Sequence, residues 1–469
     1  MSPEAIPSSE HGRAPRRVVI TGVGLVSPLG NSAPALWDAL RQARSGLGDV
    51  PHLALDAYRT RVGGAVRDFV PRQYISDSKS LKLMTRPVRL GVAAMELAAQ
   101  DAGLIAAGKP TPLLAELNPA RIGCFVGSPG HAGDRDELLR ALDLSYGNGD
   151  GGGLDLAAFG AVGIPTVNPL WLLKSLANLV LYFVSLRLGA QGPNANICMS
   201  GAGGAMAVGE AFHAIRYGRA DLAMAGGYES LLDEERLESF EPSGLLYLGD
   251  GAAAAASRPF DRDRAGFVAA EGGAFLVLEE AERAQHRGAR IYGELRGYGT
   301  AASGVAHGGA GRANETAEAF AGAMEAALTD ARLQAWDLAA IYAQGLATER
   351  SDRAEAEALK QLLTARAAYT PVTAVKSMTG NLLAGSGPLE VIAAIAALGS
   401  SPGAVGYVPP ILNLDHPDPD LGLDYVRGTA RAGEFARILV NAGGLGGTVA
   451  SLIIERTLDH SLERAGGVQ

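Results

Sequence analysis

Short apolar runs alternate with amphipathic segments along the chain from Arg16 to Arg456. The short runs have the length and composition of β-strands. We expect strands at residues 18–21, 122–126, 196–198, 222–225, 274–278, 339–343, 438–441 and 449–454. Strands that alternate with helices are typical of parallel sheets covered by helices. The pattern therefore predicts an α/β protein.

Three segments predict helices. In two of them, after Gly201 and from Ala317, apolar residues recur at the spacing of one helix face. These residues are Ala205, Val208, Phe212 and Ile215 in the first segment, and Ala317, Phe320, Met324, Ala327 and Leu328 in the second. The third segment, 169–190, is the most apolar window, but Lys174, Asn178 and Arg187 interrupt it. It is too polar to span a membrane and predicts a buried helix instead.

A short repeated sequence, referred to below as the echo, occurs in both halves of the chain. The sequence Ala-Gly-Gly-Tyr at 225–228 follows one predicted strand, and Ala-Gly-Gly-Leu at 442–445 follows another. This echo indicates a duplication with a junction near residues 282–291. We expect an N-terminal half at 16–285 and a C-terminal half at 286–457, with tails at 1–15 and 458–469.

Composition limits the function. Hydrophobic residues make up 47% of the chain and charged residues 19%, the balance of a soluble globular protein with a large core. A formal charge of −9 argues against nucleic acid as the main partner, although a local basic patch would still dock an acidic protein. Two cysteines, Cys124 and Cys198, cannot form a disulfide framework or a zinc cluster. With a polar opening segment that lacks a signal-peptide core, the chain is expected in the cytoplasm without a metal.

The segment 192–205 predicts a short strand that turns sharply into a helix. A residue at the start of that helix lies in the field of aligned N–H dipoles. This field would ionise a thiol and prepare it to attack an acyl carbonyl. The residue at the turn is Gly201, which has no side chain with which to attack.

Five ordered motifs resemble those of the β-ketoacyl synthases of fatty-acid and polyketide assembly, and they cover nearly the full length of the chain. They are RVVITGVGLVSPLG at 17–30, GPNANICMSGAGGA at 192–205, FDRDRAGFVAAEGG at 260–273, KSMTG at 376–380 and NAGGLGGT at 441–448. The resemblance implies the family's fold, which is the five-layered α/β/α/β/α thiolase fold built from two similar halves.

In that family, a cysteine carries the growing acyl chain, and two histidines stabilise the enolate and the thioester oxyanion of a decarboxylative condensation. By resemblance, these three positions fall on Gly201, Gln344 and Asn381. Glutamine and asparagine donate hydrogen bonds, but they do not shuttle protons near neutral pH. The chain thus resembles a ketosynthase without its catalytic groups. Three charged residues of the family's pattern are retained, namely Asp352, Glu355 and Lys376.

Loss of all three groups on an intact scaffold resembles one subfamily, the chain-length factor or ketosynthase β subunit of type II polyketide synthases. The motifs at 202–204, 352–357 and 378–390 are similar to that subfamily. Its members usually carry glutamine where this chain has Gly201. Any contribution of such a glutamine to malonyl decarboxylation would be lost here.

Chain-length factors pair with a cysteine-bearing ketosynthase, and the tunnel for the growing chain crosses their interface. The resemblance implies that condensation comes from the partner and that this chain binds no cofactor of its own. Its substrate would be carried on the phosphopantetheine of acyl carrier protein, and neither nucleic acid nor a membrane would be a partner. By the same resemblance, the segment after Gly127 lines the tunnel. His131 and Gly133 stand there in place of bulky gates, which favours a long tunnel and a linear polyene product.

Two other functions remain open. One is an acyltransferase or decarboxylase with displaced chemistry on Cys198 or Gln344. Cys198 lies three residues before Gly201, within the predicted strand, where the helix dipole does not reach it, and a small buried hydrophobe is the usual role of such a cysteine. We therefore place Cys198 and Met199 at the tunnel or interface, and Met199 or a neighbour could fill the space at Gly201. The other function is a homodimer that scaffolds carrier protein without shaping a product.

Overall fold

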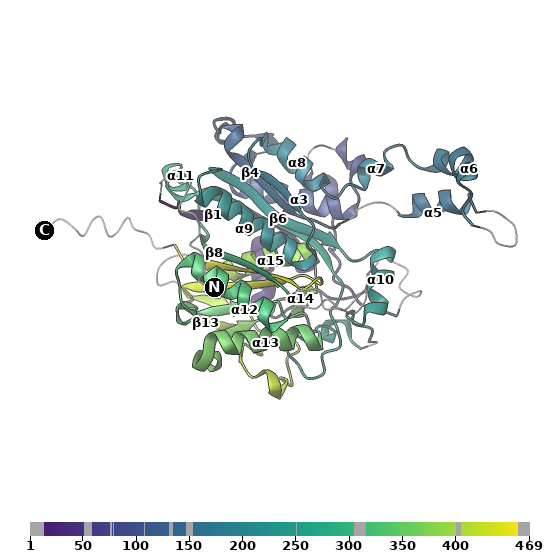
Figure 1. The fold of residues 1–469 in the computed structure, drawn as a ribbon. Coiled ribbons are helices and arrows are strands. Elements are labelled where there is room, and N and C mark those ends of the chain that lie inside the picture. Colours follow the sequence, from purple (N-terminus) through teal and green to yellow (C-terminus); the bar gives the residue numbers. More distant parts are fainter. Residues whose placement is uncertain are drawn as a thin grey trace, which may run out of the picture.

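The structure is a computed structural model that describes residues 14–50, 59–75, 77, 79–106, 108–130, 135–146, 153–249, 251–303, 316–399 and 405–457. His131, Gly133 and the tails at 1–13 and 458–469 lie outside the described residues. The described residues form a layered body from which one arm projects (Figure 1).

The described strands include one sheet of eleven strands, which divides into two halves where β1 meets β8. Only three residue pairs join these two strands. From that junction, the N-terminal half runs β1 (Val18–Val26), β7 (Glu271–Glu280), β6 (Leu222–Ser230), β4 (Ile122–Gly127) and β5 (Asn194–Ile197). The C-terminal half runs β8 (Gly293–Ala302), β15 (Thr448–Glu455), β14 (Arg437–Gly443), β9 (Ala340–Tyr342), β10 (Pro371–Thr373) and β12 (Asp424–Tyr425).

Both halves repeat one sequence of strand directions. The pairs β1–β7 and β7–β6 are antiparallel, and β6–β4 and β4–β5 are parallel. Likewise, β8–β15 and β15–β14 are antiparallel, and β14–β9 and β9–β10 are parallel. The two similar halves are confirmed, but the expectation of purely parallel sheets is wrong. Residues 444–447 connect β14 to β15 and are too few for a parallel crossover, so they force an antiparallel pair.

Helices form three layers around the two half-sheets, which gives five layers in all (Figure 1). Between the half-sheets lie α9 (Gly203–Arg216) and α15 (Ser386–Leu398). The outer layers contain α3 (Arg86–Asp101) and α8 (Leu179–Leu188) on the N-terminal half, and α12 (Ala317–Ala331) and α13 (Glu349–Leu363) on the C-terminal half. This arrangement is the thiolase-like fold of ketosynthases.

The central helix α9 shows why the helical spacing was informative. Ala205, Val208, Phe212 and Ile215 are all buried in one hydrophobic core, as the sequence predicts. Glycine and alanine fill most other positions of the helix, because both of its faces pack against sheets. The predicted helix from Ala317 is also confirmed, and the Thr316 side chain caps it by accepting from the N–H of Ala319 (3.3 Å).

All eight predicted strands occur, but β8 and six strands of two or three residues each were missed among the described residues. The sequence of β8 contains Gly293, Gly297 and Gly299, which weakens any strand pattern. A Cβ atom at Gly297 or Gly299 would collide with the backbone of α12, so these glycines let the helix lie directly on the sheet. The strand predicted at 196–198 lies at Asn194–Ile197 instead, which leaves Cys198 outside it.

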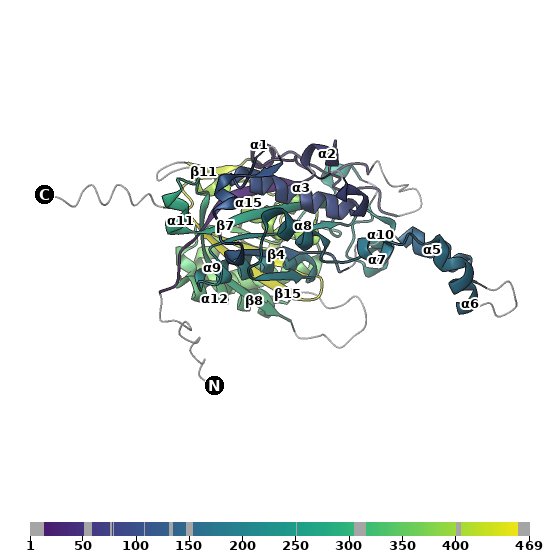
Figure 2. The ribbon, with the colours of Figure 1, turned by 90° about the horizontal axis from the view of Figure 1, so that it is seen from above.

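The single buried helix expected at 169–190 is two helices, α7 (Trp171–Lys174) and α8. Leu172 is 70% exposed, and the chain turns between the two helices. Apolarity alone therefore predicted burial wrongly here. With α5 (Arg135–Asp143) and α6 (Leu156–Ala158), α7 belongs to the arm that projects from the layered body (Figure 2). Helix α10 (Glu234–Phe240) lies below this arm in the view of Figure 1.

The remaining short elements connect these layers. They are α1 (Ala33–Arg41), α2 (Pro71–Tyr74), β2 (Ile105–Ala106), β3 (Lys109–Pro110), α4 (Pro112–Ala115), α11 (Ala281–His286), α14 (Lys376–Thr379), β11 (Gly406–Val408) and β13 (Arg431–Gly433). Among the helices of the described residues, none is long and apolar enough to cross a membrane.

Candidate functional site

The predicted sharp turn lies between β5 and α9, at the centre of the molecule. Ser200 adopts a left-handed backbone conformation (φ 50°), and residues Ser200–Ala202 form one tight 3₁₀ turn that leads into α9. Gly201 is buried at this turn. A side chain here would project where two strands end and a helix begins, the usual geometry of a nucleophile elbow.

The space beside Gly201 is filled by backbone from the C-terminal half. A Cβ atom added at Gly201 would lie much closer than 3.0 Å to the carbonyl oxygen of Gly443, and 3.3 Å from its carbonyl carbon. Real Cβ atoms do not approach other atoms so closely. Met199 does not fill this space, since the residue is 40% exposed and the atoms nearest to the added Cβ belong to Gly443 and Gly444. The place of a side chain at Gly201 is therefore occupied by backbone atoms and is not an empty space.

Gln344 follows β9 and is fully buried. Its backbone N–H donates to Glu355 Oε1 (2.9 Å), and the N–H of Gly345 donates to Glu355 Oε2 (3.0 Å). The side-chain amide lies against Gly443, because a Cβ atom added at Gly443 would overlap its oxygen and lie 2.6 Å from its Cδ. The Glu355 carboxylate thus binds the backbone of Gln344, while the side-chain amide of Gln344 packs against the backbone of β14.

A buried network of charges supports this arrangement. Lys376 Nζ donates to the carbonyl oxygen of Gln344 (2.9 Å) and to the Glu390 carboxylate. Burial raises the pKa of Glu390 to about 7, against the opposing effect of the Lys376 ammonium. Burial also raises the pKa of Glu355, which accepts a hydrogen bond from Asn441 Nδ2 (3.0 Å). Since buried charges need partners, the network fixes the backbone around Gln344.

Asn381 follows Gly380, at the end of α14, and is buried. Its Oδ1 accepts from the N–H of Leu383 (3.0 Å) and from the hydroxyl of Ser386 (3.3 Å). Its backbone pairs with the strand segment around Ala269. The side-chain oxygen is therefore engaged in shaping the turn before α15.

Asp352 connects two loops near the site. Its carboxylate accepts from the N–H groups of Phe260 (2.8 Å) and Ala347 (3.0 Å), and Arg264 Nε lies 3.8 Å away. Burial raises its pKa to about 7. In this geometry, Asp352 holds the loop after Gln344 against the 260–273 motif.

The two cysteines lie in different surroundings. Burial raises the pKa of Cys124 to about 12, so its thiol stays protonated. Cys198 is exposed at the end of β5, and not a buried strand residue as expected. Its sulfur lies 3.3 Å from Asn196 Nδ2 and 3.5 Å from Ser128 Oγ. Cys198 and Met199 are thus on the surface that flanks β5, apart from the charged network.

The structure brings Gly201 and Gln344 together through Gly443, and it brings Lys376 and Glu355 to the backbone of Gln344. None of Gly201, Gln344 and Asn381 has a side chain that can act as a nucleophile or shuttle a proton at neutral pH. Among the described residues, no cluster of His, Cys, Asp or Glu could hold a metal ion.

Two participants were missed from the sequence. Glu390 is the one charged residue of an otherwise apolar helix, which was a readable signal of a buried partner. Gly443 gave no signal, because the approach of its carbonyl to Gly201 joins distant parts of the chain.

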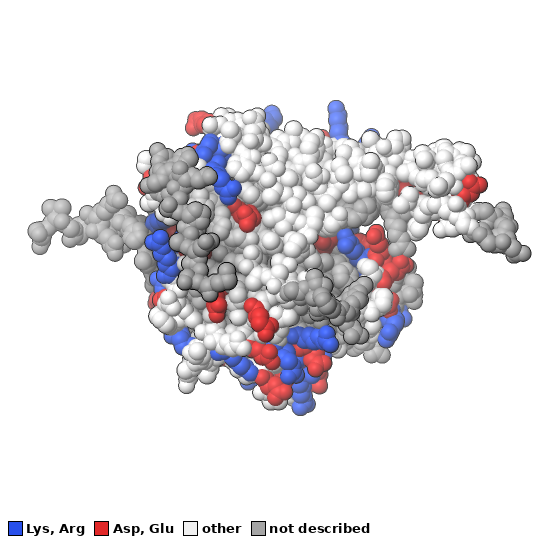
Figure 3. Space-filling model, viewed as in Figure 1, with Lys and Arg blue, Asp and Glu red and all other residues white. Residues whose placement is uncertain are grey.

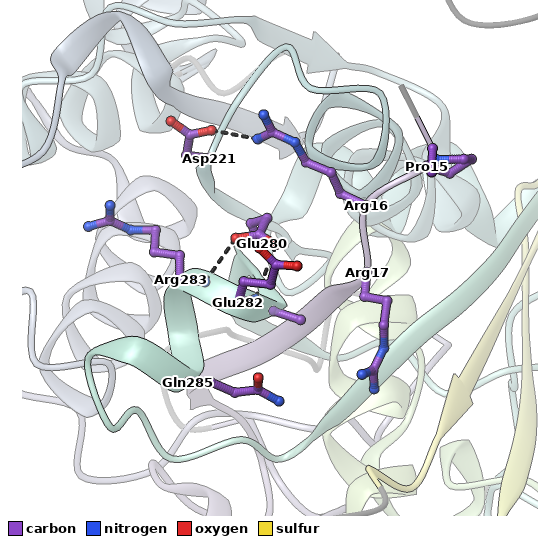
Figure 4. A pocket seen from close by; sticks show the side chains of 10 residues that line it. Pro15, Arg16, Arg17, Asp221, Glu280, Glu282, Arg283 and Gln285 are labelled. Carbon is purple, nitrogen blue, oxygen red and sulfur yellow. Dashed lines mark hydrogen bonds and ion pairs between the residues drawn. The ribbon is translucent and has the colours of Figure 1, made fainter. Parts of the chain in front are cut away.

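A cavity of about 930 Å³ lies away from this site (Figure 4). It is lined by residues at the start of β1 and by α11, and the Arg16 N–H donates to the carbonyl of Arg216 at the far end of α9 from Gly201. Its arginines are paired, Arg16 with Asp221 (2.7 Å) and Arg283 with Glu279 (3.1 Å). The cavity therefore has no connection with the predicted chemistry.

Comparison with known proteins agrees with this geometry. Residues 15–284 match the family model "Beta-ketoacyl synthase, N-terminal domain", and residues 292–415 match "Beta-ketoacyl synthase, C-terminal domain". The chain is 34% identical to 3-oxoacyl-(acyl-carrier-protein) synthase 2 of Synechocystis sp. over 447 residues, which cover 94% of this chain and 98% of the relative. It superposes on "The ishigamide ketosynthase/chain length factor" with a TM-score of 0.80 and 26% identity, over 95% of this chain and 100% of that one. It also superposes on the structure of a "type II PKS acyl-carrier protein in complex with its ketosynthase bound to the hexaketide", with a TM-score of 0.77 and 28% identity, over 94% and 100%. The chain therefore belongs to the β-ketoacyl synthase family.

Proposed function

We propose that this chain is a non-condensing chain-length factor, which pairs with a cysteine-bearing ketosynthase in the cytoplasm. It shapes the tunnel for a polyketide or polyene chain carried on acyl carrier protein. The observation that carries the proposal is the carbonyl oxygen of Gly443 in the place of a nucleophile at Gly201. With glutamine and asparagine at the other two positions, condensation has to come from a partner subunit.

The surface around β5 supports a protein partner. Within the described residues, β5 pairs with β4 alone, so its outer edge has no strand partner. Figure 3 shows few charges over α8 and the arm, which belong to the same half of the chain. Residues 139–186 and Met199, which follows β5, include these exposed large apolar residues: Leu139, Leu144, Tyr146, Leu154, Leu156, Val162, Ile164, Leu170, Leu172, Leu173, Leu176, Tyr182, Leu186 and Met199. An open strand edge together with a broad apolar surface favours a subunit interface.

A basic surface segment supports docking of an acidic carrier protein. In residues 59–82, exposed cations outnumber exposed acids, although the whole chain carries a charge of −9. The segment lies close to the site, because the N–H of Gly64 donates to the carbonyl of Ala269 (2.9 Å), which neighbours Asn381. The cations are Arg59, Arg61, Arg67, Arg72, Lys79 and Lys82, and the acids are Asp68 and Asp77. Charge reversal at Arg72 and Lys82 is expected to weaken carrier binding at low salt, with a smaller effect at high salt.

Two structural neighbours are consistent with these partners. The printed title of one names a ketosynthase/chain length factor, and that of the other names an acyl-carrier protein in complex with its ketosynthase. The proposal extends both kinds of partner to this chain. The tunnel role of His131 and Gly133 stays a prediction, and Gly133→Phe is expected to shorten the product.

The two rival functions make different predictions. An acyltransferase or decarboxylase that uses Cys198 requires this thiol for activity, whereas a chain-length factor does not. A scaffolding homodimer forms without any ketosynthase.

Native mass spectrometry of complexes captured from the producing cell through a tag on this chain is the decisive experiment. A one-to-one complex with a ketosynthase that retains cysteine and both histidines supports the proposal. A stable homodimer without such a partner, especially with an acyl mass on Cys198, overturns it.

A further inference from the structure

Gly201, Gly443 and Gln344 pack in a row, each one against the next. The carbonyl of Gly443 lies where a side chain of Gly201 would be, and the amide of Gln344 lies where a side chain of Gly443 would be. The Gly443 carbonyl and the Gln344 amide thus fill the two places that side chains at positions 201 and 443 would need.

The middle member of this row is held on both sides. Gly443 ends β14 and pairs with Val449, and the N–H of Gly444 donates to the carbonyl of Thr448 (2.7 Å). On the side of the turn, a Cβ atom at Gly444 would lie 2.7 Å from the carbonyl oxygen of Met199. The peptide between β14 and its hairpin therefore has little room to move away from Gly201.

Gln344, at the other end of the row, also has little freedom to move away from Gly443. The backbone of Gln344 is bound by Glu355 through its N–H and by Lys376 through its carbonyl oxygen. A backbone fixed at both groups keeps the amide pressed toward Gly443. Any side chain placed at position 201 would push Gly443 toward that amide.

We propose that the side chain of Gln344 acts as a wedge: it holds the Gly443 peptide against Gly201, so that only glycine fits at position 201. A nucleophile can then return to position 201 only when residue 344 changes as well. The inference deepens the proposed function, on which it rests, by naming the residue that keeps the condensation site closed.

A double-mutant cycle on the full-length chain tests the wedge. Gly201→Ala is expected to lower the melting midpoint by roughly 2–8 °C, since overpacking a filled site is destabilising. In a Gln344→Ala background, the same change is expected to cost less than half of that shift, because Gly443 can then retreat. Gly446→Ala is the matched control: this exposed glycine of the same hairpin has nothing within 4 Å of its added Cβ, so no decrease is expected.

Equal shifts from Gly201→Ala in both backgrounds would overturn the wedge. If Gly201→Ala yields no folded protein, Gly443→Ala is compared in the two backgrounds instead, and additivity there overturns the proposal equally. These measurements need no partner and no activity. A negative result in the double-mutant cycle would therefore overturn the wedge without contradicting the chain-length-factor proposal. A homodimer in the capture experiment would overturn the chain-length-factor proposal without changing the stability results.

Discussion

The two halves of this protein share one order of strands but differ at the corresponding sheet edges. Among the described residues, the sheet of the N-terminal half ends at β5, whose outer edge has no strand partner, and α8 and the arm of the same half expose large apolar side chains. In the C-terminal half, β12 covers the outer edge of β10, and the exposed large apolar side chains of the described residues are only Trp336, Tyr369 and Val405. Figure 3 shows the contrast, with charges gathered around α13 and few over α8.

The halves differ inside the molecule as well. The N-terminal half supplies the glycine turn at Gly201, which carries no functional group. The C-terminal half supplies the buried charges Lys376, Glu390 and Glu355. The comparison teaches that two half-sheets with the same order of strand directions can carry different side chains: large apolar groups are exposed mainly in the N-terminal half, and the charged network around Gln344 lies in the C-terminal half.

Breaking the interior network should have the largest effect. Lys376→Met leaves Glu390 buried without its cation, and we expect it to lower the free energy of unfolding by about 3–5 kcal/mol. Arg431→Met is the control, since its pair with Asp424 is partly exposed and should contribute less than about 1 kcal/mol. Urea unfolding of the two variants measures both values. Equal losses would refute the special role given to the interior of the C-terminal half.

The proposed subunit interface of the N-terminal half is tested by replacing exposed apolar side chains of the arm and α8 with charged ones. Leu172→Asp combined with Leu186→Asp should weaken the complex with the ketosynthase by about 100-fold or more, because carboxylates replace apolar contact area. Trp336→Asp, on the exposed surface of the C-terminal half, should leave affinity unchanged. Titration monitored by native mass spectrometry distinguishes the two. A comparable loss with Trp336→Asp would mean that the interface was assigned to the wrong half.

A buried carboxyl of the N-terminal half should make stability depend on pH. Burial raises the pKa of Glu229 from 4.5 to about 8, and its nearest ion partner, Arg236, is 3.8 Å away. Between these two values the folded state holds a proton that the unfolded state releases, so the free energy of unfolding falls as pH rises through this window. Relative to the parent, Glu229→Gln should gain roughly 3–4 kcal/mol in free energy of unfolding on going from pH 5 to pH 8.

The control for this pH effect is Glu234→Gln, a change at an exposed residue of the neighbouring α10. Unfolding of the parent and both variants at several pH values provides the comparison. If the difference between Glu229→Gln and the parent stays constant with pH, Glu229 is charged in the folded state.

The smallest effect is expected at Cys198. Cys198→Ala removes an exposed thiol beside β5 and should leave the rate of condensation by the proposed heterodimer unchanged. Product formation and the mass of the complex are measured together, so that a lost interface is not mistaken for lost chemistry. Lost activity in an intact complex would support the rival acyltransferase or decarboxylase.

The sequence was informative wherever a local pattern carried the structure. The apolar spacing of α9 predicted its buried residues, and the five motifs led to the fold and to Gly201, Gln344 and Asn381. Local patterns failed where packing decided the outcome. The glycines of β8 are required because the backbone of α12 leaves no room there for a Cβ atom. Leu172 is exposed on the arm, although its segment is the most apolar of the chain. The contact of Gly443 with Gly201 depends on how the halves meet, which no local spacing records.

The open edge of β5 also bears on how the protein is made. A chain that leaves the ribosome before its partner is present displays unpaired backbone groups and a broad apolar surface, the features that promote aggregation. If the chain pairs with a ketosynthase as proposed, copies in excess of the partner are expected to be lost to aggregation and proteolysis, because association stabilises the folded state. The yield of active complex should follow the scarcer subunit, so matched synthesis of both chains matters more than abundant synthesis of this one.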